Sequence, residues 1–372
     1  MSERPQIARE VRELVRPQLI EMPGYEPVEP VDVIARRLGI PEERVVKLDG
    51  NENPYGPSPR VAQALGDFGY YHIYPDPAQT RVREAVAKYV GADVDQIVLG
   101  SGSDELLNLT AMLFLSPGDV MVNAPPTFGM YEFLGRIYDA RIVSVLRNED
   151  FSLDLPALEN ALDGAKLLYL ASPNNPTGNS MTATELKRLL ERGAVIAVDE
   201  AYAEFTGKSF VDMVGTYDNL IVVRTFSKWA GLAGLRAGYA VFPKALADIV
   251  WKVKVPYNLS VAAETAILAS LEDAPTLRRN VELIIAERER LSGKLRELPW
   301  LRPYPSDANF VLCDVRGPRA KDVRDRLREQ GIMIRYFDSL GLRNCLRISV
   351  GKPEHSDRLL EALREIGAGV GK

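Results

Sequence analysis

The chain has 372 residues, which exceeds the usual size of one hydrophobic core and favours two domains. Hydrophobic residues make up 46% of the chain and the net charge is −5, so composition gives no general attraction to nucleic acid or acidic membranes. No apolar run approaches the length of a membrane span, and the charged start MSERPQIAREVREL lacks the apolar core of a secretory signal, so we expect a cytoplasmic protein.

Cysteine and histidine are scarce. The two cysteines, Cys313 and Cys345, lie in apolar strand-like runs, and we expect buried free thiols rather than a disulfide. The two histidines, His72 and His355, favour surface or capping roles. This scarcity argues against histidine-led chemistry and against a zinc site, and no metal site is predicted.

The first 77 residues combine short helices with irregular loops. Helices are predicted over Ile7–Val15 and Val31–Leu38. The Asn/Gly/Pro-rich segment Leu48–Pro59 predicts a loop, and a loop of such specific composition favours a functional role. The aromatic segment Phe68–Pro77 fits either a functional loop or a hydrophobic satellite cluster.

From Ala78 onward, strands alternate with helices. The predicted strands are Gln96–Leu99, Val120–Asn123, Arg141–Leu146, Lys166–Ala171, Ala194–Val198, Ile221–Val223 and a returning strand, Gly238–Phe242. The predicted helices are Arg81–Tyr89, one that reaches about Leu115, and Thr182–Arg192 with a threonine cap. This alternation predicts a mostly parallel sheet with helices on both faces.

The rest of the chain predicts a second, smaller unit. A long helical region, Ser260–Leu298, is interrupted near Pro275 and connects the two units. The predicted strands are Asn309–Val315, Ile332–Phe337 and Cys345–Val350, and the predicted helices are Arg319–Gln330 and Ser356–Ile366. We therefore divide the chain into an N-terminal arm with part of the small domain (1–50), a large domain (51–258) and a small C-terminal domain (259–372).

Polar segments follow the ends of successive predicted strands, at 100–105, 125–128, 172–178, 199–202 and 225–228. This repetition is the strongest pattern in the chain, because open α/β sheets bind ligands at the carboxyl ends of their strands. The Gly/Ser loop at 100–105 leaves free N–H groups at a helix start, which suits an anion. It does not complete G-x-G-x-x-G, and the terminal GAGVGK does not complete a phosphate loop, so neither predicts a nucleotide site.

Lys228 is the centre of the predicted site. It follows a buried strand, where loss of hydration favours the neutral amine and makes it a nucleophile. Arg236 stands eight residues later, behind a Gly/Ala/Leu segment that allows close backbone approach. This grouping suits an anionic cofactor with a reactive carbonyl, and the alternative is a solvated loop with ordinary charges.

These residues together fit pyridoxal phosphate. Lys228 would bind the aldehyde, Asp199 would keep the ring nitrogen protonated, and Tyr202 would reach the ring hydroxyl; these three are the predicted catalytic residues. The predicted cofactor contacts are Gly102, Ser103, Asp104, Phe128, Asn175, Asp199, Tyr202, Thr225, Ser227, Lys228 and Arg236. Individually, Asp199 could be a helix cap, Phe128 a core residue and Arg236 a surface charge.

Several motifs resemble a known family. SPNNPTG at 172–178, VDEAY at 198–202 and SK…AGLR at 227–236 resemble the fold-type I aminotransferases of class I and II. NENPYGPSP at 51–59, YPDP at 74–77, APPTFGMY at 124–131 and LRISVG at 346–351 are most similar to the branch that acts on histidinol phosphate. The resemblance implies a pyridoxal-phosphate fold with a mostly parallel seven-stranded sheet between helices and a smaller α+β domain. It also implies a homodimer with active sites at the subunit interface.

The resemblance also assigns substrate contacts. Tyr74 of one subunit would reach the cofactor phosphate of the other, and Asn53 and Asn175 would lie near the substrate. Arg347 matches the arginine that holds the α-carboxylate of glutamate, and Arg335 matches a second phosphate-contacting arginine. Tyr25 matches an N-terminal tyrosine near the imidazole end of the substrate. Trp229 departs from the family pattern, because a smaller residue usually follows the lysine.

The expected reaction is amino-group exchange between histidinol phosphate and 2-oxoglutarate, in histidine biosynthesis, with small molecules and a second subunit as the only partners. Two alternatives with the same cofactor remain, an aromatic aminotransferase and a threonine-phosphate decarboxylase. A more distant alternative is a ligand-binding module without catalytic activity. The intact lysine and aspartate argue against that module.

Overall fold

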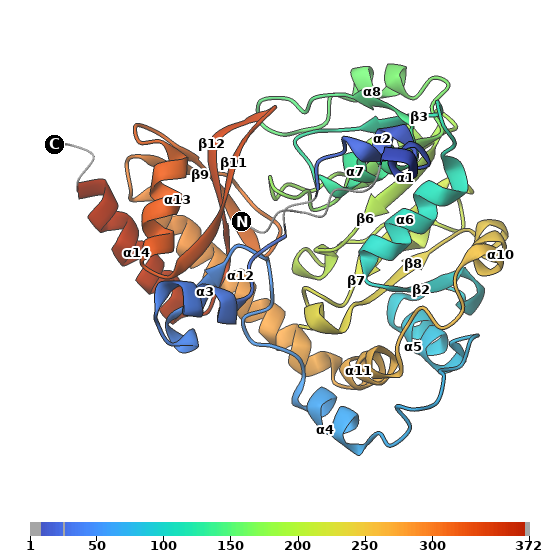
Figure 1. Ribbon diagram of the computed structural model, residues 1–372, viewed down its shortest axis with the longest axis horizontal. Coiled ribbons are helices and arrows are strands. Elements are labelled where there is room, and N and C mark those ends of the chain that lie inside the picture. Colours follow the sequence, from blue (N-terminus) through green and yellow to red (C-terminus); the bar gives the residue numbers. More distant parts are fainter. Residues whose placement is uncertain (1–8, 25–26, 369–372) are drawn as a thin grey trace.

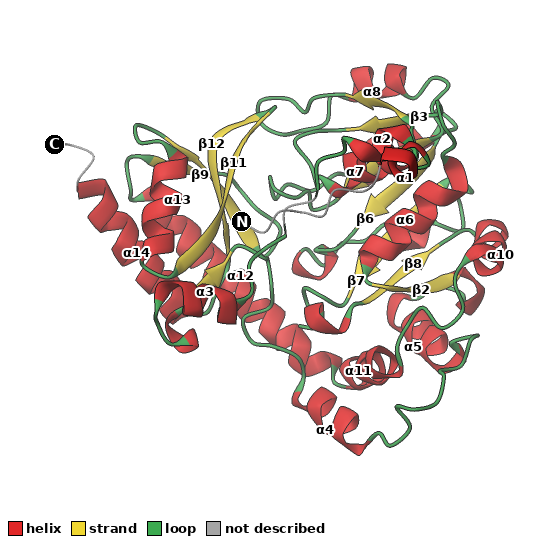
Figure 2. Cartoon of the chain, in the orientation of Figure 1, coloured by secondary structure: helices red, strands yellow, loops and turns green. Residues whose placement is uncertain are grey.

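The computed structural model describes residues 9–24 and 27–368, which form two sheets with surrounding helices (Figures 1 and 2). The larger sheet has seven strands in the order β2-β8-β7-β6-β5-β3-β4. Their bounds are β2 Ile97–Ser101, β3 Val120–Asn123, β4 Arg141–Ser144, β5 Leu167–Ala171, β6 Val195–Asp199, β7 Leu220–Thr225 and β8 Ala237–Val241. Only β8 among them runs antiparallel to its neighbours, so the prediction of a mostly parallel seven-stranded sheet is confirmed.

The larger sheet is buried on both faces because its strands are nearly continuous apolar runs. In β7, Leu220 and Val222 face one core cluster, which includes residues of α5, α8, α9 and α11. Ile221 and Val223 face the other cluster, with residues of α6, α7 and α10. The helices are α4 Pro59–Asp67, α5 Thr80–Val90, α6 Ser103–Phe114, α7 Met130–Ile137, α8 Leu155–Ala161, α9 Ala183–Leu190, α10 Lys244–Val253 and α11 Val261–Glu272.

The smaller sheet has five strands in the order β1-β11-β12-β10-β9. Their bounds are β1 Val46–Leu48, β9 Leu301–Pro303, β10 Phe310–Val315, β11 Ile332–Ser339 and β12 Leu342–Ser349, with helices α3 Val31–Leu38, α13 Ala320–Glu329 and α14 Pro353–Ala368 nearby. β1 pairs in parallel with β11, which brings the N-terminal segment into the small domain. Two short helices, α1 Arg9–Glu13 and α2 Pro17–Ile20, precede α3 and β1 in the chain.

Helix α12, Ala274–Arg296, connects the two units. Leu277 and Ile284 belong to the core of the larger sheet, whereas Leu291 and Leu295 belong to the core of the smaller one. α11 also packs with the larger core, against α4, although it follows the predicted boundary after residue 258. The chain therefore passes from the core of the larger sheet to the core of the smaller sheet within α12.

Most predicted elements match the structure within a few residues. The helix Val31–Leu38 ends at Gly39 with φ 65°, and Thr182 caps α9 by accepting a hydrogen bond from the Glu185 N–H. The helical region Ser260–Leu298 is interrupted near Pro275 as predicted, because α11 ends at Glu272 and α12 begins at Ala274 with Pro275 in its first turn, where proline is accommodated. The sequence interpretation missed α2, α4, α7, α8, α10, β1 and β9.

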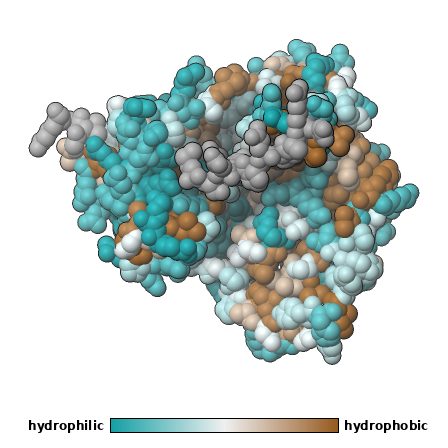
Figure 3. Space-filling view, in the orientation of Figure 1, coloured by the Kyte–Doolittle hydropathy of each residue, from teal (hydrophilic) through white to brown (hydrophobic). Residues whose placement is uncertain are grey.

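Cys313 and Cys345 are both buried and free, as expected. Within residues 9–24 and 27–368, no helix combines the length and apolar character needed to cross a membrane. In the view of Figure 3, the small-domain half is mainly hydrophilic, whereas larger hydrophobic patches lie over the half that holds the seven-stranded sheet.

Candidate functional site

A cavity of about 930 Å³ lies between the carboxyl ends of the large-sheet strands and the small-domain strands β11 and β12. This position agrees with the expected ligand site of an open α/β sheet. Twelve of the predicted site residues line it: Ser103, Asp104, Phe128, Asn175, Asp199, Tyr202, Thr225, Ser227, Lys228, Arg236, Arg335 and Arg347. The structure thus brings together residues that are separated by more than 200 positions in the sequence.

Lys228 follows β7 and its Nζ donates a hydrogen bond to the carbonyl oxygen of Gly50, at 3.0 Å. Burial is the main influence on this amine, and the nearby Arg347 cation adds to it; together they lower the pKa of Lys228 to about 8. At pH 7 about a tenth of the amine is therefore neutral, far more than for an ordinary lysine, and the neutral form is what a nucleophile or base requires.

Asp199 ends β6 and is almost fully buried. Burial raises its pKa to about 6, while the hydroxyl of Tyr131, which donates to Oδ2 at 2.9 Å, opposes that shift. The Ala201 N–H donates to Oδ1 at 3.0 Å, so both carboxylate oxygens have a donor. Lys228 also contributes electrostatically to the Asp199 pKa, which agrees with the two groups sharing one cavity.

Tyr131 is a site residue that the sequence interpretation missed. It lies in the first turn of α7, three residues after Phe128, and its ring meets the Phe128 ring edge-on at 5.7 Å. It is fully buried and stacks on Tyr169 at 5.1 Å. Its place in the APPTFGMY segment was the available signal, but only the fold shows that its hydroxyl meets Asp199.

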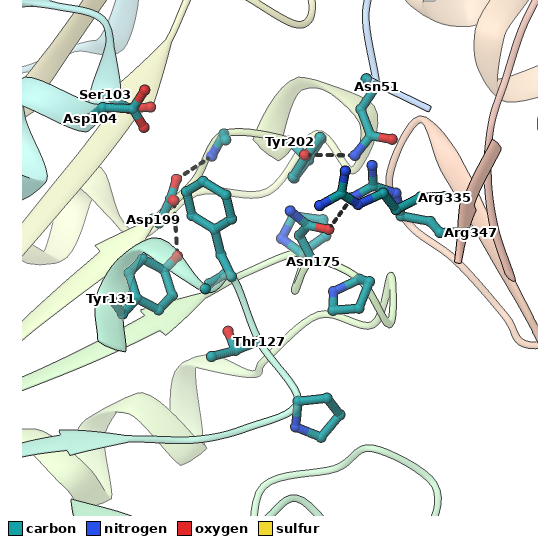
Figure 4. Close-up of a pocket in the computed structure, with 18 of the residues that line it drawn as sticks. Asn51, Ser103, Asp104, Thr127, Tyr131, Asn175, Asp199, Tyr202, Arg335 and Arg347 are labelled. Atoms are coloured by element: carbon teal, nitrogen blue, oxygen red, sulfur yellow. Dashed lines mark hydrogen bonds between the residues drawn. The ribbon is translucent and has the colours of Figure 1, made fainter. Parts of the chain in front are cut away.

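Tyr202 and Asn175 lie on neighbouring loops beside the cavity. The Tyr202 hydroxyl accepts a hydrogen bond from Asn51 Nδ2 at 2.9 Å, and Asn175 Oδ1 accepts one from Arg347 Nη1 at 2.6 Å (Figure 4). Asn51 lines the cavity although it was not predicted to do so. Asn53 was predicted near the substrate, but its Nδ2 donates to the Trp229 carbonyl at 2.8 Å and it is not among the cavity-lining residues.

One end of the cavity is formed by the start of α6 and by Arg236. Arg236 Nη2 lies 3.1 Å from Asp104 Oδ2, and both side chains are partly exposed. Gly102, which caps α6 with φ 81°, does not itself line the cavity. A Cβ at this position would lie 2.5 Å from Arg236 Nη2, so glycine is needed for the guanidinium to lie across the helix start. Ser103 and Ser227 line the same cavity.

Two arginines project into the other side of the cavity from neighbouring strands. Arg335 on β11 and Arg347 on β12 are cross-strand partners, so their side chains share one face of the smaller sheet. Arg347 is buried, donates to the Asp49 carbonyl at 2.6 Å, and lies over the ring of Phe310. Two adjacent guanidinium groups favour an anionic ligand that carries more than one charge.

Two further residues named from the sequence, Tyr74 and Trp229, are not among the residues that line the cavity. Tyr74 is 79% exposed, stacks on Tyr257 at 4.7 Å and does not line the cavity, and Tyr25 lies outside the described residues. Trp229 is fully buried and stacks on Tyr89 at 5.2 Å, so its large ring extends the core behind the lysine. The roles predicted for Tyr74 and Tyr25 stay predictions.

Comparison with known proteins agrees with this geometry. The family described as aminotransferase class I and II matches residues 43–363. A histidinol-phosphate aminotransferase of Roseiflexus castenholzii is 51% identical over 363 residues, which cover 95% of this chain and 98% of that protein.

Two solved structures extend the comparison. A histidinol-phosphate aminotransferase from Sinorhizobium meliloti, solved in complex with pyridoxal-5'-phosphate, superposes with a TM-score of 0.86 at 28% identity, covering 96% of this chain and 98% of that one. An L-threonine-O-3-phosphate decarboxylase from Porphyromonas gingivalis has a TM-score of 0.77 at 23% identity, covering 87% of this chain and 99% of that one. The second likeness shows a shared fold alone.

Proposed function

The chain belongs to the class I and II aminotransferase family, and on that premise we propose that it transfers an amino group between histidinol phosphate and 2-oxoglutarate. The products are imidazole-acetol phosphate and glutamate, and the reaction belongs to histidine biosynthesis. The observation that carries this proposal is that Lys228, Asp199 and the Arg335–Arg347 pair line one cavity.

The residues of the cavity fit pyridoxal phosphate. Lys228 provides a partly neutral amine, Asp199 provides a buried carboxylate, and the start of α6 with Arg236 provides donors for a phosphate. The missing Cβ of Gly102 leaves the space that the Arg236 guanidinium occupies across this helix start. When bound, the cofactor supplies an aldehyde that takes up the amino group and a protonated ring that accepts electrons.

Lys228 has two tasks in this proposal. It holds the cofactor between turnovers, and once released it removes and returns the proton at the substrate Cα. Its lowered pKa serves the second task, because a base is most effective when its pKa lies near the operating pH.

Asp199 keeps the ring nitrogen protonated by pairing with it. An isolated carboxylate at this depth would tend to become neutral, but the Tyr131 hydroxyl and the Ala201 N–H stabilise its ionised form. Asn175 and Tyr202 lie on adjacent loops and can donate toward the ring hydroxyl.

Arg335 and Arg347 would bind the acidic end of each substrate. Histidinol phosphate presents a phosphate dianion and no carboxylate, whereas glutamate presents an α-carboxylate, and a pair of guanidinium groups can serve both. The hydrogen bond from Arg347 to Asn175 links this end to the loop beside the ring.

A substrate panel tests the proposal. Steady-state rates with histidinol phosphate, phenylalanine and threonine phosphate separate the proposed reaction from an aromatic aminotransferase and from a threonine-phosphate decarboxylase. The Arg335–Arg347 pair favours phosphorylated substrates, and the first compound should be turned over fastest by kcat/KM. Near-absent turnover of histidinol phosphate would rule out the proposal, and failure of borohydride to attach the cofactor at Lys228 would support a non-catalytic module.

We also propose that the working form is a homodimer, located in the cytoplasm. Tyr70, Tyr71, Ile73 and Tyr74 are all more than half exposed, which is unusual for neighbouring large hydrophobic side chains and suits a surface that a second copy covers. Tyr74 would then reach the phosphate end of the partner's cavity.

Mixing two inactive variants tests the shared site. K228A lacks the amine and Y74A lacks the cross-subunit contact, but a mixed dimer holds one cavity with both wild-type residues. Random pairing should restore about a quarter of the wild-type sites. Mixtures no more active than the average of the separate variants would contradict a cavity shared between subunits.

A further inference from the structure

Asn258 lies in the turn between α10 and α11 and makes four side-chain hydrogen bonds. Its Oδ1 accepts from Gln79 Nε2 at 3.0 Å and from Lys254 Nζ at 2.6 Å. Its Nδ2 donates to the Leu99 carbonyl at 3.1 Å and to Glu105 Oε2 at 2.8 Å. These bonds use the full capacity of a side-chain amide, two donors and two acceptor lone pairs.

The charges around this amide determine its orientation. The Lys254 ammonium can only donate and the Glu105 carboxylate can only accept. Exchanging the oxygen and nitrogen of the amide would place two donors together at Lys254 and two acceptors together at Glu105. The amide dipole therefore connects a cation to an anion. Neither leucine nor aspartate at this position could make all four contacts.

On one side, Asn258 holds the loop that begins α6. Glu105 Oε2 also accepts a hydrogen bond from the Ser101 N–H. The carboxylate to which Asn258 donates therefore also holds the backbone of the loop. Gly238 of β8 packs against the same loop so closely that a Cβ there would lie 2.8 Å from the Ser103 nitrogen. The loop is thus enclosed between β8 and the Asn258–Glu105 pair.

On the other side, Asn258 holds the aromatic segment that faces outward. Its partner Gln79 lies within the turn in which Asp76 accepts hydrogen bonds from the Ala78 and Thr80 N–H groups. Tyr257, the residue before Asn258, stacks on Tyr74 with an interplanar angle of 27°. Tyr257 has φ 60°, a conformation that costs energy for a tyrosine and persists where surrounding contacts impose it.

We propose that Asn258 is a positioning residue that couples the phosphate-binding loop 100–105 to the Tyr74 surface, so that cofactor binding and association with a second copy strengthen each other. The proposal rests on the proposed function, because the phosphate and the second copy both come from it. By linkage, the two effects determine each other: in a dimer with two equal cofactor sites, the factor by which two bound cofactors tighten the dimer is the square of the factor by which dimerisation tightens each site.

N258D tests the coupling because it places a carboxylate oxygen beside Glu105 with little change in shape. We expect the Kd of the cofactor-free protein for pyridoxal phosphate to rise about tenfold or more, the loss of one hydrogen bond to a charged group. The ratio of dimer dissociation constants without and with cofactor, measured by sedimentation over a dilution series, should fall toward one.

The double variant N258D/E105Q restores a donor facing an acceptor, since a glutamine amide can donate to the new aspartate, and it should recover part of both effects. N219D is the matched control. Asn219 Nδ2 donates to the Leu190 and Ala194 carbonyls, both at 2.9 Å, next to the amino end of β7 and away from the cavity. N219D should leave the cofactor Kd and the ratio of dimer dissociation constants unchanged.

The outcomes distinguish failure of the proposed homodimer from failure of the proposed role of Asn258. Wild-type protein that remains monomeric with cofactor bound would contradict the proposed homodimer and with it the coupling. A second outcome is that the wild-type protein dimerises and N258D has the same cofactor Kd and the same ratio of dimer dissociation constants. This outcome would overturn the role of Asn258 and leave the homodimer in place. Equal losses in N219D and N258D would also overturn it.

Discussion

The hydroxyl of Tyr131 donates a 2.9 Å hydrogen bond to Asp199 in a part of the interior where both residues are buried. The two side chains come from α7 and from the end of β6. Burial strongly raises the pKa of Tyr131 itself, so this hydroxyl remains a neutral donor throughout the working range of pH.

Y131F should move the acidic limb of the kcat/KM pH profile upward by about one to two pH units. The reason is that a hydrogen bond to a charged group contributes about 1.5–3 kcal/mol, and one pKa unit corresponds to about 1.4 kcal/mol. The pKa of Asp199 is already raised to about 6, and losing the donor raises it further, so the carboxylate ionises only at higher pH.

Y169F is the control for this prediction. Tyr169 is also fully buried and stacks on Tyr131, but its hydroxyl donates to the Leu107 carbonyl at 2.8 Å instead of to Asp199. Y169F should keep the wild-type profile. If both variants shift equally, the effect comes from disturbed packing and not from the Tyr131 donor.

The rate at which cofactor-free protein incorporates pyridoxal phosphate should rise with pH and level off above about 8, the lowered pKa of Lys228. Only the neutral amine attacks the aldehyde, so the rate follows the neutral fraction. R347Q removes a cation that contributes to this lowering, and should move the midpoint to higher pH. Stopped-flow absorbance gives the rate, and a wild-type rate that keeps rising to about 10, as for an ordinary lysine, would refute the expectation.

G102A should weaken cofactor binding as well as stability. With φ 81° and ψ 172°, Gly102 lies in a region that is nearly exclusive to glycine, so another residue there costs roughly 1–3 kcal/mol. The new Cβ would also displace the Arg236 guanidinium. G193A separates these effects, because Gly193 has φ 84° but a Cβ there would meet nothing within 4 Å. Both variants should lose unfolding free energy in urea, and only G102A should show an increased cofactor Kd.

R224M should destabilise the protein by about 3–5 kcal/mol, because it leaves buried carboxylates without their cation. Arg224 Nη2 lies 2.7 Å from Glu204 Oε1, and each of these side chains is only 9% exposed. Burial already raises the pKa of nearby Glu200 to about 7.

The exposed pair Arg188–Glu159 has the same 2.7 Å separation but a half-exposed arginine, so R188M should cost about 1 kcal/mol or less. Urea unfolding measures both variants. Equal losses would show that burial does not set the cost of breaking these pairs.

The amino-acid sequence by itself indicated most strands of the larger sheet and the chemistry of the site. β-Branched apolar runs such as Ile221–Val223 predict buried strands, and polar residues placed directly after them gather at one edge of a parallel sheet. Lys228 and Asp199 could therefore be assigned before their positions were known.

Only the tertiary structure decided which other side chains join them. Asn51 and Asn53 stand two positions apart in one irregular loop, yet the first binds Tyr202 and the second binds the Trp229 carbonyl. The register that sets Arg335 beside Arg347 and the packing that turns Tyr131 toward Asp199 depend on contacts between distant segments. Such contacts leave no periodic signal in the sequence, because their geometry arises only when separate elements pack against one another.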